Sequence, residues 1–273
     1  MKFTQKLHKA QRRNSSLLCV GLDIDPALLP SHVRSTSNPV LQFNRRVIDA
    51  TSDLVCAYKL NLAFYEALGE QGWHLLRQTL AHIPGGVITI GDGKRGDIGN
   101  TSERYAKALY DVLGFDAATV NPYMGQDSVA PFIQSESHCA FILILTSNKG
   151  SGDFQRITIG GRPFYEKVVH AAVKWNSKKN VGLVVGATHP EELQPIRRMA
   201  PEMPILIPGI GKQGGDLEFA VRYGCNKKGE LAIINASRSI IYASNGKDFA
   251  SAARKEATKL RNQILAYQEQ YFG

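Results

Sequence analysis

A short charged segment near the middle of the chain carries the residue types that electrostatic and acid–base catalysis require. Asp92, Lys94 and Asp97 lie in the run Asp-Gly-Lys-Arg-Gly-Asp. Side chains two positions apart in an extended strand point to the same side, so Asp92 and Lys94 can pair. A lysine beside a carboxylate stays protonated, and the carboxylate stays ionised. The segment therefore predicts a site that acts through fixed charges, the alternative being a solvated turn.

A glycine-rich turn and a later arginine form a second candidate site. Residues 208–216 read Pro-Gly-Ile-Gly-Lys-Gln-Gly-Gly-Asp, and Ser237 and Arg238 follow a separate apolar run. Glycines let backbone N–H groups approach an anion closely, and a guanidinium can bind phosphate through two N–H groups. We therefore expect these two segments to hold a phosphate group, the alternative again being a plain turn.

The elements that would position these residues alternate along the chain. Eight short apolar runs predict strands that are buried on both faces; they lie at residues 17–22, 54–60, 87–90, 117–120, 140–145, 181–185, 204–207 and 231–234. Segments with helical periodicity separate them, at residues 38–53, 62–81, 101–113, 126–135, 162–178, 189–199 and 216–223. A short helix at 238–242 and a long amphipathic helix at 247–271 are expected after the last strand.

This alternation indicates an α/β protein built as a single (β/α)8 TIM barrel with parallel strands. No linker divides the chain, so residues 1–273 are expected to form one domain. A doubly wound open sheet is the alternative fold. The residues that follow the strands of a barrel meet at one mouth, so we expect Asp23 and Lys59 beside Asp92 and Lys94. Charges gathered there cost several kcal/mol per ion unless they pair, and proteins seldom build such a row for stability alone.

The composition excludes several classes of protein. Hydrophobic residues make up 43% of the 273 residues and charged residues 21%, which is typical of a globular chain with a large core. Apolar runs reach about six residues, whereas a membrane helix needs roughly 20, so no membrane span is expected. The basic N-terminus lacks the apolar region of a secretory signal. The four cysteines form no C-x-x-C pair, which favours a reducing compartment and a cytoplasmic protein.

The charge balance favours a small anionic ligand. A net charge of +9, from 33 Lys and Arg against 24 Asp and Glu, suits phosphate groups. The basic residues are dispersed, and no zinc-finger or RNA-recognition signature is present, so no nucleic-acid partner is expected. The seven histidines are also scattered, and we expect no metal site.

Residues 92–101 resemble the D-x-K-x-x-D-I-x-x-T signature of the orotidine 5′-phosphate decarboxylases. The resemblance extends over nearly the whole chain. At Tyr58-Lys59 and residues 61–66 the chain is similar to the longer bacterial-type subgroup. Leu22-Asp23, the turn at 208–216 and Ser237-Arg238 also match the family. It implies decarboxylation of orotidine 5′-monophosphate to UMP and CO2, the last step of de novo UMP biosynthesis, with no metal or organic cofactor.

The same resemblance implies roles for individual residues. Lys94 would donate the proton to C6 of the pyrimidine, Asp92 would lie beside the departing carboxylate, and Lys59 and Asp97 would complete the charged network. Asp23 and Lys59 would lie near the ribose hydroxyls. The substrate-binding residues would be Asp23, Ile98, Thr101, Ser147, Pro208, Gln213, Ser237 and Arg238, with Gln213 and Arg238 on the phosphate.

The resemblance further implies a homodimer. In the family, the second aspartate of the signature and its isoleucine and threonine come from the partner subunit, so Asp97, Ile98 and Thr101 would reach the neighbour's site. One departure from the family is Ser237, because many relatives have glycine there. A second is the pyrimidine loop at 146–150, where Ser147 matches the family's serine and Asn148 is a rival.

Two other functions remain open at this stage. Mg2+-dependent sugar-phosphate decarboxylases and aldolases share D-x-K-x-x-D, but they have an acidic Mg2+ ligand at the second strand end. Lys59 stands there in this chain, and a cation cannot ligate Mg2+. The other is a non-catalytic barrel that binds a phosphate ligand or nucleic acid, which only the net charge supports. Residues 149–161 suit a lid and a disordered loop equally, and helix 247–271 could pack on the barrel or extend an interface.

Overall fold

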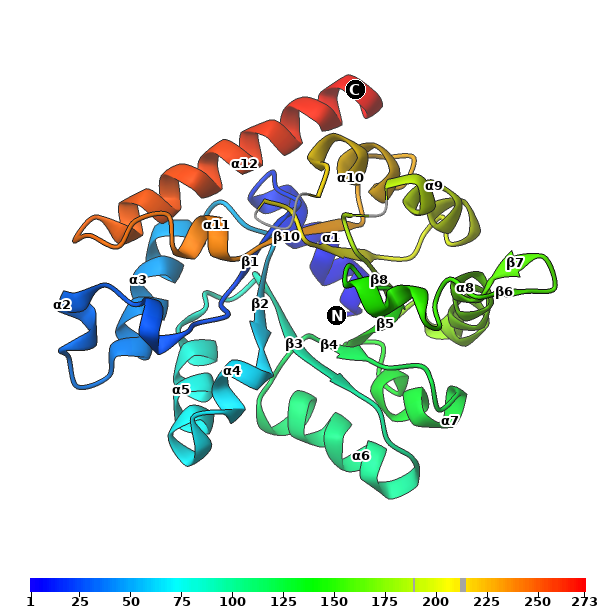
Figure 1. Ribbon diagram of the computed structural model, residues 1–273, viewed down its shortest axis with the longest axis horizontal. Coiled ribbons are helices and arrows are strands. Elements are labelled where there is room, and N and C mark those ends of the chain that lie inside the picture. Colours follow the sequence, from blue (N-terminus) through cyan, green and yellow to red (C-terminus); the bar gives the residue numbers. More distant parts are fainter. Residues whose placement is uncertain (189, 212–214) are drawn as a thin grey trace.

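The expected strands form one closed, parallel barrel, in the order β1-β10-β9-β8-β5-β4-β3-β2 (Figure 1). The structure, a computed structural model, describes residues 1–188, 190–211 and 215–273. The strands are β1 Leu18–Gly21, β2 Ala57–Asn61, β3 Ile88–Arg95, β4 Ala117–Val120, β5 Cys139–Leu145, β8 Val181–Val185, β9 Ile205–Pro208 and β10 Ala232–Ala236. Most strand positions are buried, as continuous apolar runs in a parallel sheet require. The TIM barrel is confirmed, and the open doubly wound sheet is wrong.

Helices follow the strands and surround the barrel (Figure 1). In α3, Val40, Phe43 and Val47 recur at helical spacing and are buried, so one stripe of that helix packs inward. The helices are α2 Ser31–Arg34, α3 Pro39–Thr51, α4 Leu62–Glu66, α5 Gly69–His82, α6 Gly99–Lys107, α7 Gln126–Val129, α8 Phe164–Trp175, α9 Pro190–Met199, α10 Leu217–Gly224, α11 Arg238–Ile241 and α12 Phe249–Phe272. Short turns of 3-10 or π helix are η1 Pro26–Leu28, η2 Ala108–Val112, η3 Ala130–Ile133, η4 Lys149–Gly152 and η5 Asn176–Lys178.

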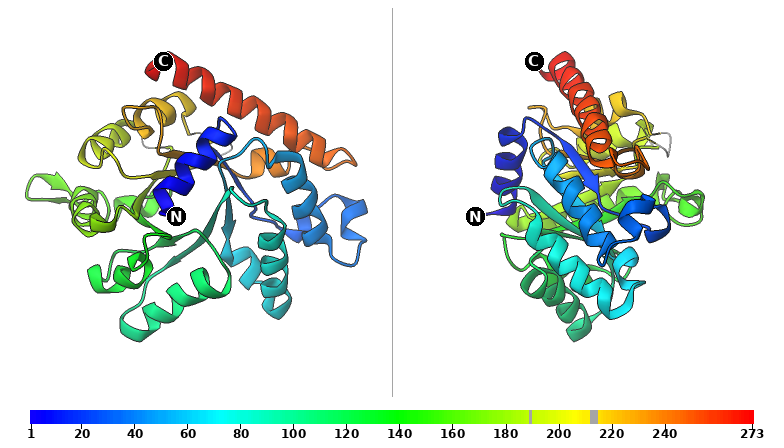
Figure 2. Two further views of the ribbon diagram at one scale, coloured as in Figure 1. Left: turned by 180° about the vertical axis from the view of Figure 1, so that it is seen from behind. Right: turned by 90° about the vertical axis from the view of Figure 1, so that its left-hand side faces the viewer.

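Three segments differ from the sequence expectation or complete it. The single helix expected at 62–81 is two helices, because Ala67 and Leu68 separate α4 from α5, which begins at Gly69 with a left-handed φ of +63°. Residues 149–161 contain η4 and lead into a hairpin of β6 Thr158–Ile159 and β7 Arg162–Pro163. The C-terminal helix α12 packs on α3, α10 and α11 and so belongs to the outer layer of the barrel (Figure 2). Within the described ranges, no helix could cross a membrane.

An additional helix, α1 Phe3–Arg13, lies across the N-terminal end of the barrel (Figure 2). The Phe3 ring meets Phe141 of β5 edge to face, with ring centroids 6.0 Å apart. Gln11 Nε2 donates a hydrogen bond of 2.8 Å to the Ala232 carbonyl at the start of β10. These contacts fill that end of the barrel and leave the carboxyl ends of the strands as the open mouth.

Candidate active site

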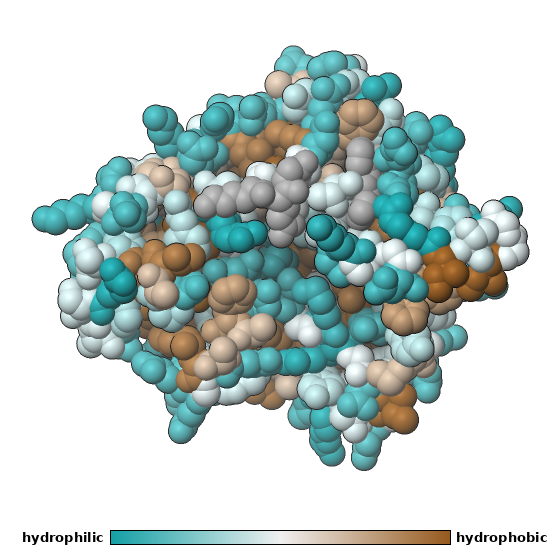
Figure 3. Space-filling view, viewed as in Figure 1, coloured by the Kyte–Doolittle hydropathy of each residue, from teal (hydrophilic) through white to brown (hydrophobic). Residues whose placement is uncertain are grey.

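A cavity of about 610 Å³ occupies the mouth at the carboxyl ends of the strands. Figure 3 faces this mouth and shows hydrophilic side chains gathered near the centre. Most of the predicted site residues line the cavity: Asp23, Lys59, Asp92, Lys94, Ser147, Pro208, Ser237 and Arg238. The barrel therefore brings the charged segment after β3 to the same cavity as the phosphate-binding candidates after β9 and β10.

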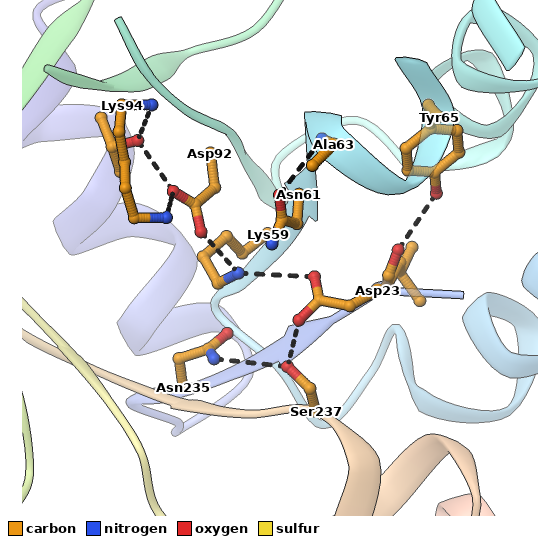
Figure 4. Close-up of polar contacts among 11 residues, drawn as sticks. Asp23, Lys59, Asn61, Ala63, Tyr65, Asp92, Lys94, Asn235 and Ser237 are labelled. Carbon is orange, nitrogen blue, oxygen red and sulfur yellow. Dashed lines mark hydrogen bonds and ion pairs between the residues drawn. The ribbon is translucent and has the colours of Figure 1, made fainter. Parts of the chain in front are cut away.

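The charged residues form a row of alternating sign across the mouth (Figure 4). Lys59 Nζ on β2 lies 3.5 Å from Asp23 Oδ1 and 3.0 Å from Asp92 Oδ2. The other carboxylate oxygen of Asp92, Oδ1, is 2.8 Å from Lys94 Nζ. The order is thus Asp23, Lys59, Asp92, Lys94, with Asp92 held between two ammonium groups.

Burial differs along the row, and this sets the role that each charge can have. The Lys59 and Asp92 side chains are 5% and 9% exposed, whereas Lys94 is 48% exposed. Burial alone lowers the pKa of Lys59, but Asp23 and Asp92 outweigh it and raise that pKa above its ordinary value. Burial alone raises the pKa of Asp92, but Lys59 and Lys94 outweigh it and hold that pKa well below its usual range. Lys59 and Asp92 are therefore both charged at neutral pH.

The Asp92–Lys94 pair forms as expected, but not through regular strand geometry. Lys94 has a left-handed φ of +45°, and the register of β3 against β4 shifts between Gly91 and Arg95. The strand therefore bulges at Lys94, and the assumption of an extended strand there was wrong. Thr119 on β4 hydrogen-bonds both the Asp92 side chain and the Lys94 backbone.

Thr119 is a site residue that the sequence does not single out, because it lies within the apolar run 117–120. One signal was available. Ala118 and Val120 flank a threonine within the apolar run, so alternation along the strand places residue 119 on the face opposite to theirs. A lone hydroxyl at an inward position near a strand end is a candidate partner for the charged row.

Ser237 connects the other end of the row to β10. Its hydroxyl donates a hydrogen bond of 3.0 Å to Asp23 Oδ2 (Figure 4). Gly21 on β1 makes room for this side chain, because a Cβ at position 21 would lie 1.9 Å from Ser237 Oγ. Ser237 is therefore accommodated by a glycine on the neighbouring strand.

The loop after β5 brings both candidate pyrimidine contacts to the cavity. Ser147 and Asn148 both line it. Asn148 Oδ1 accepts a hydrogen bond of 2.7 Å from Thr146 Oγ1, and Gln155 Oε1 accepts one of 2.8 Å from the Thr146 backbone N–H. The loop is thus fastened to the segment that precedes β6, and the choice between Ser147 and Asn148 stays open.

Other predicted residues lie elsewhere. Asp97, Ile98 and Thr101, at the start of α6, do not line the cavity. Asp97 Oδ1 accepts a hydrogen bond from the Ile98 backbone N–H, and the Ile98 residue is 56% exposed. Gln213 lies outside the described residues. Among the residues that the structure describes, no three His, Cys, Asp or Glu side chains are grouped as metal ligands.

Comparison with known proteins assigns the family. A sequence model described as "Orotidine 5′-phosphate decarboxylase / HUMPS family" matches residues 16–253. The chain belongs to this family. An orotidine 5′-phosphate decarboxylase of Dehalococcoides mccartyi is 52% identical over 99% of this chain and 100% of that protein. One from Herpetosiphon aurantiacus is 51% identical over 93% of this chain and 95% of that protein.

Solved structures of the family share the fold. The structure of Leishmania donovani OMP decarboxylase superimposes with a TM-score of 0.86 and 37% identity, covering 98% of this chain and 99% of that one. As a member of this decarboxylase family, the chain is an enzyme of the carboxy-lyase class. Lys59 and Asp92 are largely buried in the mouth, and buried charges act more strongly on a developing charge than they would in water.

Proposed function

We propose that this enzyme decarboxylates orotidine 5′-monophosphate to UMP and CO2, the last step of de novo UMP biosynthesis. The observation that carries the proposal is the position of Lys94. Its ammonium is 2.8 Å from Asp92 and half exposed where it lines the cavity. The named decarboxylases that match the chain over almost its full length support the choice of substrate.

The chemistry needs a proton donor more than an electron sink. The bond between C6 and the carboxylate breaks, its electron pair stays on C6, and CO2 leaves. The pyrimidine ring delocalises that pair poorly, so the transition state must be stabilised by charge. Lys94 supplies the positive charge and then a proton to C6, and its amine regains a proton from water. Asp92, fixed by Lys59 and Lys94, orients the donor and repels the carboxylate that departs.

The remaining lining residues bind the parts of the substrate that do not react. Asp23 and Lys59 contact the ribose hydroxyls, and Ser147 or Asn148 contacts the pyrimidine. Arg238, with Pro208, Ser237 and Gln213, binds the phosphate. Binding energy from this remote phosphate orders the site around the reacting carbon. No metal takes part, and Lys59 supports this, because its ammonium occupies the position between Asp23 and Asp92 where the Mg2+-dependent relatives need an acidic ligand.

We further propose that the enzyme acts as a homodimer, each protomer a single domain of residues 1–273, in the cytoplasm. The position of Asp97, Ile98 and Thr101 outside their own cavity supports a role in the partner's site. The four cysteines are free and buried, which suits a reducing compartment. Neither nucleic acid nor a membrane is a partner.

The test follows the absorbance of the orotate ring when the protein is mixed with orotidine 5′-monophosphate in the presence of EDTA. The absorbance of the orotate ring should fall, and UMP should appear in an amount equal to the orotidine 5′-monophosphate consumed. Orotidine without phosphate, the matched control, should react far more slowly. A folded protein that leaves the nucleotide unchanged would overturn the proposal, and the assay would then move to sugar phosphates with Mg2+.

A further inference from the structure

The backbone that carries Lys94 is held in an uncommon conformation. Its φ of +45° is left-handed, which a non-glycine residue adopts only where its surroundings enforce it. Gly91 pairs with Ala118 and Arg95 pairs with Val120, so three residues of β3 face only Thr119 on β4. The bulge leaves the Lys94 backbone N–H without a ladder partner on the neighbouring strand.

A single hydroxyl provides that partner and also binds the acid. Thr119 Oγ1 accepts a hydrogen bond of 2.9 Å from the Lys94 backbone N–H and donates one of 2.8 Å to Asp92 Oδ1. A threonine hydroxyl has one proton to donate, and here it is directed to Asp92. The same Asp92 oxygen also receives the Lys94 ammonium at 2.8 Å, and Thr119 is 1% exposed. The Lys94 backbone is therefore hydrogen-bonded to Thr119, and the Lys94 ammonium is bonded to Asp92, which Thr119 also binds.

We propose that Thr119 is a positioning residue for the reaction, because it fixes the bulge of Lys94 and the carboxylate of Asp92 in one rigid frame. The inference rests on the proposed function, in which Lys94 protonates C6. Thr119 acts through Lys94 and Asp92, so its loss displaces the proton donor without removing a charge. Displacements of about 1 Å in such a group cost on the order of 100-fold in rate.

Elsewhere the chain offers a matched control. Thr89 on β3 makes the same pair of bonds at the closed end of the barrel: its hydroxyl accepts from the Asp116 backbone N–H at 3.1 Å and donates to Asp116 Oδ2 at 3.2 Å. That carboxylate also receives a lysine, Lys6, at 2.8 Å. Thr89 is buried and does not line the cavity. Substitution of Thr89 therefore reports how the loss of such a hydroxyl affects stability, without an effect on catalysis.

The experiment measures kcat, KM and the midpoint of thermal unfolding for Thr119→Val, Thr119→Ser and Thr89→Val beside the wild type. Thr119→Val should lower kcat on the order of 50-fold with KM changed by less than about threefold. Thr119→Ser keeps the hydroxyl and should stay within about threefold of the wild-type kcat. Thr89→Val should lose stability to a similar degree and keep its kcat. Thr119→Ala is measured as well, so that a misfolded valine variant does not decide the result.

Several outcomes would overturn the inference. They are a wild-type kcat in Thr119→Val or Thr119→Ala, a serine variant as slow as the valine variant, or an equal loss of kcat in Thr89→Val. These differ from a failure of the proposed function itself, in which the wild type leaves orotidine 5′-monophosphate unchanged and no variant comparison arises.

Discussion

Lys59 Nζ lies 3.0 Å from Asp92 Oδ2, and both side chains are more than nine-tenths buried in the barrel mouth. Removing one partner of a buried ion pair leaves the other charge uncompensated, which costs about 3–5 kcal/mol. Without Lys59, Asp23 and Asp92 would share only the Lys94 ammonium, so Lys59→Met should lower the free energy of unfolding by about 3 kcal/mol, the lower end of that range, and also abolish turnover. Urea denaturation with a parallel activity assay measures both effects.

The control for this prediction is an exposed pair of the same type. Lys107 lies 3.3 Å from Asp111, with both side chains more than half exposed. Such pairs contribute about 0.5 kcal/mol or less, so Lys107→Met should be nearly neutral for stability and activity. Equal effects of the two substitutions would show that burial of the row has no energetic role.

The pH dependence of stability follows from the two pKa shifts. The pKa of Asp92 is lower in the folded chain than its unfolded value of about 3.9. Its contribution is therefore complete above about pH 4 and is lost as the pH falls through the folded pKa. The pKa of Lys59 is raised above its ordinary value of about 10.4, so its contribution is complete below about pH 10 and is lost as the pH rises through the folded pKa.

We therefore expect the difference in unfolding free energy between the wild type and Asp92→Asn to be constant from about pH 5 to pH 9. The difference should shrink below about pH 4. Urea titrations at a series of pH values measure it. A difference that changes steadily across the neutral range would contradict the assigned charge states.

The role of Asp97 in the partner's site predicts subunit complementation. Asp97→Ala and Lys94→Ala should each be inactive alone. In a mixed dimer, one of the two sites combines an intact Lys94 with an intact Asp97 from the other protomer. Random mixing should therefore restore about a quarter of the wild-type activity. If mixing the unfolded variants and refolding them together restores nothing, Asp97 acts in its own protomer or not at all.

Gly21 and Ser237 form a size-matched pair that a double substitution can test. Gly21→Ala would place its Cβ 1.9 Å from Ser237 Oγ and 2.9 Å from Ser237 Cβ, so residue 237 must shift and displace the adjoining Arg238 from the phosphate. We expect affinity for UMP to fall on the order of tenfold. Ser237→Gly in the same chain removes the clash and should recover most of that affinity. Calorimetric titration of UMP into the four combinations checks this, and no recovery in the double variant would refute the steric explanation.

Much of the barrel could be predicted because its determinants are local. Buried parallel strands need continuous apolar runs, so all eight were visible in the sequence, and polar residues at their ends marked the mouth that Asp23, Lys59 and Asp92 share. The bulge at Lys94 was not visible, since it depends on a hydrogen bond to Thr119, 25 residues later in the chain. The break at Gly69 was also missed, because a glycine within a periodic segment is compatible with an unbroken helix until its φ is known.

The central claim is that Lys94 donates the proton to C6, and the Lys94→Ala variant tests it most directly. The measurement pairs turnover of orotidine 5′-monophosphate with affinity for UMP in the same preparation. We predict a fall in turnover of at least about 1,000-fold, with UMP affinity within about tenfold of the wild type, because the lysine acts mainly in the transition state. A Lys94→Ala enzyme that decarboxylates at a rate near that of the wild type would contradict the account.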